Sequence, residues 1–153
     1  MAGYIESNLT SNEQIVLKAK VSLWSQWVMI SLGILFTLSS VEKDAGGLIV
    51  IAFIFFGIAI VRVISTELAL TNKRVMAKYG FIRRDSVELR LEKVEGLYVN
   101  QSIVGRILNY GTITVSGTGG LKTPIRFISN PIYFRNVFNE FLEHPQNLID
   151  NKQ

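Results

Sequence analysis

The chain has 153 residues, of which 48% are hydrophobic and 18% charged, and its formal net charge is +4. Ordinary soluble domains carry roughly 25% charged residues, so this composition indicates a chain that does not lie wholly in water. The absence of cysteine excludes disulfides, thiolate metal sites and cysteine nucleophiles. The single histidine, His144, is expected to be a solvated tail residue, because metal binding and acid–base catalysis need organised partners.

The first 20 residues are expected to form a segment outside the main domain. At its end a period of two appears, which is the period of a strand: Ile15, Leu17, Ala19 and Val21 alternate with Val16, Lys18 and Lys20. Two interpretations remain open. The segment could pair with the sheet of a later domain, or the alternation could be a chance feature of a short lead-in.

Two long apolar runs follow, at residues 21–41 and 45–63. A helix needs about 20 mostly apolar residues to cross a bilayer core. Residues 49–60 show no polar stripe, unlike a helix that packs on a soluble core. The connector at residues 42–44 is very short, so the pattern predicts two transmembrane helices in an antiparallel hairpin.

The charges that flank these runs predict their orientation. Lys18 and Lys20 precede the first run and Arg62 closes the second, whereas the connector carries one lysine and two acids. The positive-inside rule therefore places both ends of the chain in the cytoplasm. Trp24 and Trp27 are expected to anchor the first helix at the interface, and Arg62 is expected to extend to the headgroups.

From residue 65 the pattern changes to short alternating segments separated by turn residues. Strands are predicted at residues 66–71, 74–79, 86–91, 96–100, 112–116 and 124–128. Ser102 is positioned to cap a short helix at residues 103–108. Asn130 is positioned to cap a final helix, with Pro131 at the first helical position. That helix carries apolar residues at helical spacing, which should cover an open end of the sheet: Val137, Phe138, Phe141 and Leu142.

The predicted fold class is therefore α+β. A two-helix transmembrane hairpin should be followed by a β-barrel or sandwich with a C-terminal helix, at residues 65–144, and then by a polar tail at 145–153. About 80 residues are enough for such a domain to have its own core.

Several motifs in this order resemble one known family. They are the segments at residues 70–75, 88–95, 101–108, 110–113 and 117–120. Together with the two preceding apolar runs, they are similar to the bacterial membrane-flanked PH domain family. The resemblance covers nearly the whole chain and implies a PH-like fold at the cytoplasmic face of a bacterial inner membrane. It implies no catalytic residue.

Basic residues gather in the predicted domain. Between residues 66 and 135 there are 11 lysines and arginines and five acids. Five of the basic residues surround one predicted β-hairpin: Lys73, Arg74, Lys78, Arg83 and Arg84. Beside a membrane they could bind anionic headgroups. The alternative is an ordinary solvated face.

These features favour a binding or scaffold module that docks a protein partner or anionic lipid. An alternative is an accessory subunit of a larger membrane complex, which would act through oligomerisation of the hairpin. An enzyme is disfavoured, because no acid, base and nucleophile can be grouped from these residues. No cofactor, metal site or nucleic-acid partner is expected. The glycine-rich run at residues 117–120 lacks the ending of a P-loop and is expected to be a hairpin connection.

Overall fold

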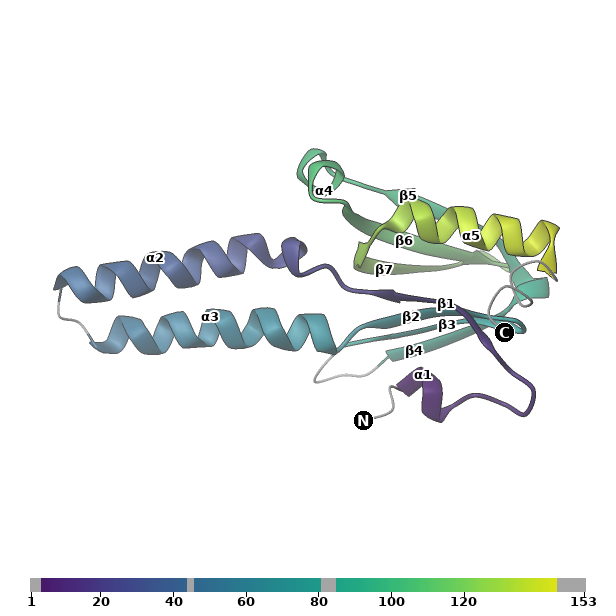
Figure 1. Cartoon of the computed structure of the whole chain (residues 1–153), viewed down its shortest axis with the longest axis horizontal. Coiled ribbons are helices and arrows are strands. Elements are labelled where there is room, and N and C mark those ends of the chain that lie inside the picture. The colour runs from purple at the N-terminus through teal and green to yellow at the C-terminus, as the bar shows by residue number, and fades with distance from the viewer. Residues whose placement is uncertain (1–3, 44–45, 81–84, 146–153) are drawn as a thin grey trace.

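The computed structural model describes residues 4–43, 46–80 and 85–145. Two long helices extend side by side from one end of a pair of antiparallel sheets (Figure 1). They are α2 (Trp27–Lys43) and α3 (Gly46–Ile64), and the 3-10 turn η1 (Leu23–Gln26) leads into the first. The sheets have two ends. The end next to the two helices is called the hairpin end, and the opposite end is called the distal end.

The first sheet contains strands from both sides of the helical hairpin. Its order is β1-β2-β3-β4, and all neighbours are antiparallel. Its strands are β1 (Ile15–Lys20), β2 (Glu67–Thr71), β3 (Arg74–Tyr79) and β4 (Asp85–Arg90). The alternating segment at residues 15–21 therefore does pair with the sheet of the later domain, because Lys20 pairs with Glu67 and Leu17 pairs with Leu70. The seven-stranded unit therefore includes residues before the hairpin, whereas the division predicted from the sequence began it at residue 65.

The second sheet has the order β5-β6-β7. Its strands are β5 (Val94–Asn100), β6 (Tyr110–Gly117) and β7 (Leu121–Ser129), and the short turn η2 (Leu91–Lys93) precedes them. The helix α4 (Ile103–Ile107) connects β5 to β6 at the hairpin end (Figure 1). Pro124 is tolerated because β7 is an edge strand of this sheet.

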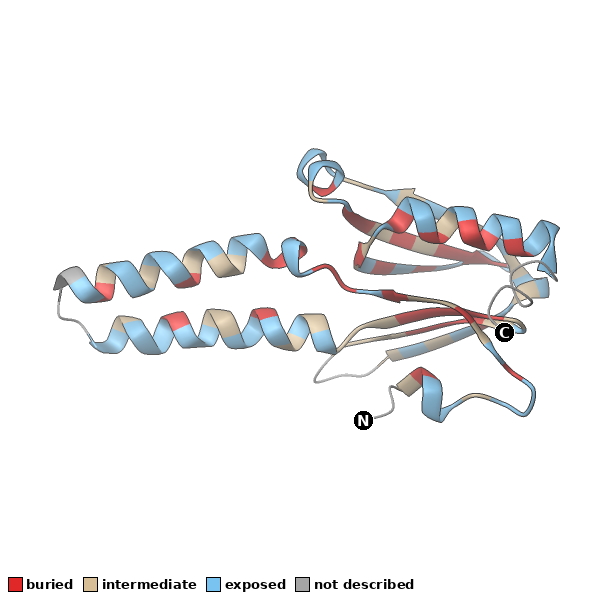
Figure 2. Ribbon diagram, viewed as in Figure 1, coloured by how far each residue is buried: buried red, intermediate tan, exposed pale blue. Residues whose placement is uncertain are grey.

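One core holds the two sheets together, and Figure 2 shows its buried residues along the strands. Leu68, Leu70, Ile113 and Ile128 are all fully buried in it. The final helix α5 (Pro131–Glu143) packs on β5, β6 and β1. A bridge between Val21 and Ile128 also links the end of β1 to β7. The short helix α1 (Tyr4–Ser7) covers the other face of the first sheet, where Ile5 packs against Ala69 and Met76.

Two details of the final helix differ from the sequence prediction. Asn130 precedes the helix, but its backbone is left-handed, with φ 49°, and its side chain makes no cap hydrogen bond. Its amide oxygen instead accepts from the side chain of Asn109. Leu142 is exposed, whereas Phe134 joins Val137, Phe138 and Phe141 in the core.

The two long helices pack closely along one face. The rings of Phe36 and Phe55 stack at 5.6 Å between centroids. A side chain at Gly33 would meet the Phe56 ring at 2.8 Å, so this glycine permits the close approach. Gly57 does not have that role, because nothing lies within 4 Å of the place where its Cβ would be.

The predicted α+β class is confirmed: two apolar helices, antiparallel sheets and a C-terminal helix form a PH-like sandwich. Leu23–Val41 and Gly46–Ile64 are both long and apolar enough to cross a membrane.

Candidate functional site

The structure does not bring the three described members of the predicted basic patch, Lys73, Arg74 and Lys78, to one place. Lys73 and Arg74 lie at the distal end, where β2 turns into β3, and Lys78 lies toward the hairpin end of β3. Strands rise about 3.3 Å per residue, so Lys78 lies about 13 Å along the strand from Arg74. Arg83 and Arg84 fall outside the described residues.

Arg74 is held by two carboxylates. Its Nε and Nη2 donate to the Glu13 carboxylate, each at 2.8 Å, and its Nη1 donates to Glu88 at 2.5 Å. The Glu13 side chain is fully buried, and it also accepts hydrogen bonds from the Thr71 hydroxyl at 2.7 Å and the Thr10 backbone N–H at 2.9 Å. Burial raises the pKa of Glu13, but the hydrogen bonds from Arg74, Thr10 and Thr71 outweigh it and lower the pKa from 4.5 to about 2.

This cluster has a structural role. It ties the segment before β1 to the turn between β2 and β3, across 61 residues of sequence. Because two carboxylates already compensate the charge of Arg74, this residue is poorly suited to an anionic ligand. Sequence reasoning missed Glu13, since no local pattern indicates a partner so far along the chain.

The other two described members of the patch also have local contacts. The Lys73 ammonium donates to the Ser11 carbonyl at 2.9 Å. The Lys78 ammonium lies over the Tyr4 ring, 5.1 Å from its centroid. Both contacts are with the N-terminal segment, so these lysines help to hold that segment on the sheet.

The three predicted interface anchors lie together at the base of the helical hairpin. Trp24 belongs to η1 and is 66% exposed, and Trp27 begins α2 and is 43% exposed. Arg62 lies in the last turn of α3 and is also exposed. Large aromatic side chains exposed beside an apolar helix are typical of a membrane–water interface.

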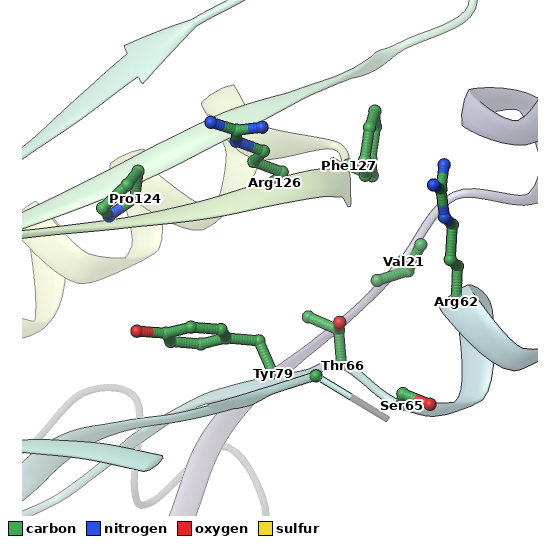
Figure 3. A pocket seen from close by; sticks show the side chains of 9 residues that line it. Val21, Arg62, Ser65, Thr66, Tyr79, Pro124, Arg126 and Phe127 are labelled. Carbon is green, nitrogen blue, oxygen red and sulfur yellow. The ribbon is translucent and has the colours of Figure 1, made fainter. Parts of the chain in front are cut away.

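An open cavity of about 400 Å³ lies next to these residues, at the hairpin end of the two sheets. Figure 3 shows Arg126 and Phe127 of β7 on one side, Thr66 and Tyr79 on the other, and Arg62 rising from the end of α3. The complete lining consists of Val21, Arg62, Ser65, Thr66, Tyr79, Gly80, Pro124, Arg126 and Phe127.

The lining of this cavity combines apolar surface with two cations. Among the residues that the structure describes, the guanidinium groups of Arg62 and Arg126 have no hydrogen bond or ion pair, in contrast to that of Arg74. An exposed guanidinium that is not engaged by a carboxylate is available to bind phosphate oxygens through its fork of N–H donors. Sequence reasoning named Arg62 only as an anchor and did not select Arg126, because the two are far apart in the chain.

The wall of the cavity is fixed by an unusual backbone at Phe127. Its φ is 66°, a left-handed value that is rare for an aromatic residue. The Phe127 carbonyl accepts from the backbone N–H of Ser22 at 2.8 Å, beside the bridge between Val21 and Ile128. The cavity wall is thus connected directly to the start of the helical hairpin, and a strained residue of this kind is often found at a ligand site.

No group of three or more histidine, aspartate or glutamate side chains able to hold a metal occurs within residues 4–43, 46–80 and 85–145.

A family model described as a bacterial PH domain matches residues 26–141 of the chain. The match begins at Gln26, the last residue of η1 before the helical hairpin, and ends in α5. No curated protein and no solved structure matches the chain.

Proposed function

This chain belongs to the bacterial PH domain family, and from that premise we propose that it is a membrane-anchored, non-catalytic binding module. Its helical hairpin crosses the bacterial inner membrane, both termini lie in the cytoplasm, and its PH-like domain docks the headgroups of anionic phospholipids. The observation that carries this proposal is the cavity at the hairpin end, where Arg62 and Arg126 border an apolar lining.

The exposure of the two helices supports their place in a membrane. Only 22% of the apolar window of the first helix and 11% of that of the second are buried against the rest of the protein. A core helix of a soluble protein would be mostly buried. The outward side chains include Leu35, Leu38 and Phe53, which are 57%, 61% and 72% exposed. An apolar surface of this extent is unfavourable in water and favourable in hydrocarbon.

The geometry at the base of the hairpin supports lipid as the ligand. Arg62 is in the last turn of α3, so in a membrane its guanidinium would reach the level of the phosphates. Arg126 lies on the other side of the same opening. Val21, Pro124 and Phe127 would contact the glycerol and upper acyl carbons, while the two arginines would contact the phosphate.

The proposed lipid site therefore excludes two residues of the basic patch that was predicted from the sequence. Lys73 and Arg74 lie at the distal end of β3, a six-residue strand that spans about 17 Å. That is about twice the Debye length at physiological salt, so their attraction to a membrane surface is largely screened. Lys78, Arg83 and Arg84 remain candidates for additional contacts with the headgroups.

Replacing both Arg62 and Arg126 with alanine is expected to weaken binding of phosphatidylglycerol by about 30-fold, because each basic residue near the surface contributes about 1 kcal/mol. Binding would be measured by native mass spectrometry on the full chain in detergent, titrated with phosphatidylglycerol or with phosphatidylcholine. The matched control replaces Lys73 and Arg90, which removes the same charge at the distal end and should leave binding nearly unchanged.

Equal binding of phosphatidylglycerol by the wild-type chain and the Arg62→Ala/Arg126→Ala variant would overturn the role of the cavity. Docking of a protein partner would then be the better explanation of the module. Equal losses in the double variant and in the distal control would mean that net charge, rather than this site, attracts the lipid.

A further inference from the structure

The helix α4 presents apolar side chains to solvent. Ile103 is 82% exposed, Ile107 is 76% exposed and Val104 is 38% exposed. Residues four positions apart lie on the same face of a helix, so Ile103 and Ile107 form one apolar surface. Isolated exposed apolar residues are common in proteins, but two isoleucines exposed side by side to this degree indicate a contact with something else.

The loop that carries these residues is rigidly built. The Ser102 hydroxyl accepts from the Gly105 backbone N–H at 3.0 Å, which caps the first turn of α4. The Gln101 side-chain amide donates to the Tyr110 carbonyl at 3.0 Å. A side chain at position 105 would lie 2.7 Å from that same carbonyl, so only glycine allows the helix to pack so closely on β6. The two isoleucines are therefore held outward by the fold itself.

The position of α4 indicates what it contacts. It lies at the hairpin end of the second sheet, level with η1 at the base of the helical hairpin (Figure 1). A membrane surface that meets the hairpin at Trp24 and Trp27 would therefore also pass close to α4.

The charge of this region favours an anionic surface. Residues 96–139 contain four basic residues and no acidic residue. Two of the four, Arg106 and Arg135, line one depression at the foot of α4 together with Ile132, which is 45% exposed. Apolar side chains beside arginines are typical of segments that insert into the headgroup region of an anionic bilayer.

We propose that α4 is a second membrane contact, in which Ile103 and Ile107 insert into the interface of the same bilayer that the helical hairpin crosses. This inference rests on the proposed membrane anchoring and adds to it. The hairpin alone would leave the domain free to tilt, whereas a second contact on the other sheet holds it at a fixed orientation and presents the cavity to the lipid headgroups.

The absence of cysteine from the chain allows a clean test. The variants Ile103→Cys and Ile107→Cys would each carry a nitroxide label on the full chain, reconstituted in vesicles of equal parts phosphatidylcholine and phosphatidylglycerol. Accessibility to oxygen and to a water-soluble nickel chelate would then be measured. Leu121 is the matched control, because it is 48% exposed at the distal end of the same sheet, and Ile54, 55% exposed in α3, is the reference inside the bilayer.

Labels at 103 and 107 are expected to lose accessibility to the nickel chelate and gain accessibility to oxygen, relative to the label at 121. Accessibilities at 103 and 107 equal to those at 121, with the label at 54 in lipid, would overturn the role of α4 and leave the hairpin anchoring intact. Low accessibility to both reagents would also overturn it, and would indicate that a protein covers α4. A label at 54 exposed to the nickel chelate would instead contradict the membrane anchoring itself.

Discussion

Replacing Arg74 with alanine is expected to destabilise the domain by about 3–5 kcal/mol, the usual cost of leaving a buried carboxylate without its partner. Glu13 would keep the hydrogen bonds from Thr10 and Thr71 but would lose both of those from Arg74. The free energy of unfolding would be measured by denaturant titration of the full chain in detergent, followed by a spectroscopic signal from the sheets.

Lys73→Ala is the matched control for this variant. Lys73 is an adjacent basic residue and also contacts the N-terminal segment, but its side chain is exposed, so its loss should cost less than about 1 kcal/mol. A variant that replaces both Glu13 and Arg74 with apolar residues of similar size should recover much of the stability. Equal effects of Arg74→Ala and Lys73→Ala would contradict the structural role of the buried pair.

Acid should diminish the difference between the wild-type chain and Arg74→Ala. The pKa of Glu13 is lowered from 4.5 to about 2 in the folded protein, so its stabilising contribution is complete above pH 4.5 and is lost as the pH falls toward 2. Without Arg74, burial favours the protonated carboxyl, and the variant should lose less stability over the same range.

Replacing the helical hairpin with a short linker is expected to convert the chain into a soluble, folded monomer. Lys20 and Glu67 are paired in neighbouring antiparallel strands, so a linker of about four to six residues can join the two strands. A fragment that begins at residue 65 should instead aggregate, because it exposes the pairing edge of β2 and loses Val16 and Ala19 from the core.

The two proteins would be compared by size-exclusion chromatography and amide hydrogen exchange. The linked protein should elute as a monomer with protected amides in β2, and the fragment should elute in aggregates or be insoluble. A fragment from residue 65 that remains monomeric, with β2 as strongly protected as in the linked protein, would contradict the role of β1 in the domain.

Local signals explain which parts of the fold could be predicted from the sequence. The bounds of β3, Arg74–Tyr79, follow from an alternating segment between turn residues, and the cap at Ser102 follows from the side chain next to the helix. The two apolar helices follow from composition alone. Each of these features depends on residues within a few positions of one another.

The other features depend on contacts between distant parts of the chain. The alternation at residues 15–21 left open whether this segment pairs with the later sheet, since the strand that β1 pairs with lies on the other side of the hairpin. Glu13 and Arg74 are also far apart in the sequence, as are Arg62 and Arg126, so no local pattern predicted the buried pair or the cavity. Asn130 was expected to cap α5 from its position, but its left-handed backbone directs the side chain to Asn109 instead.

The proposal that the hairpin crosses the membrane and leaves the domain in the cytoplasm can be tested by labelling single cysteines in spheroplasts with a membrane-impermeant maleimide. Gly46→Cys lies at the far end of the hairpin, where an added Cβ meets nothing within 4 Å, and Lys122→Cys lies at the exposed distal end of the domain. We expect position 46 to react in intact spheroplasts and position 122 to react only after permeabilisation. Reaction of position 122 in intact spheroplasts, or of neither position until the membrane is opened, would contradict the proposed arrangement.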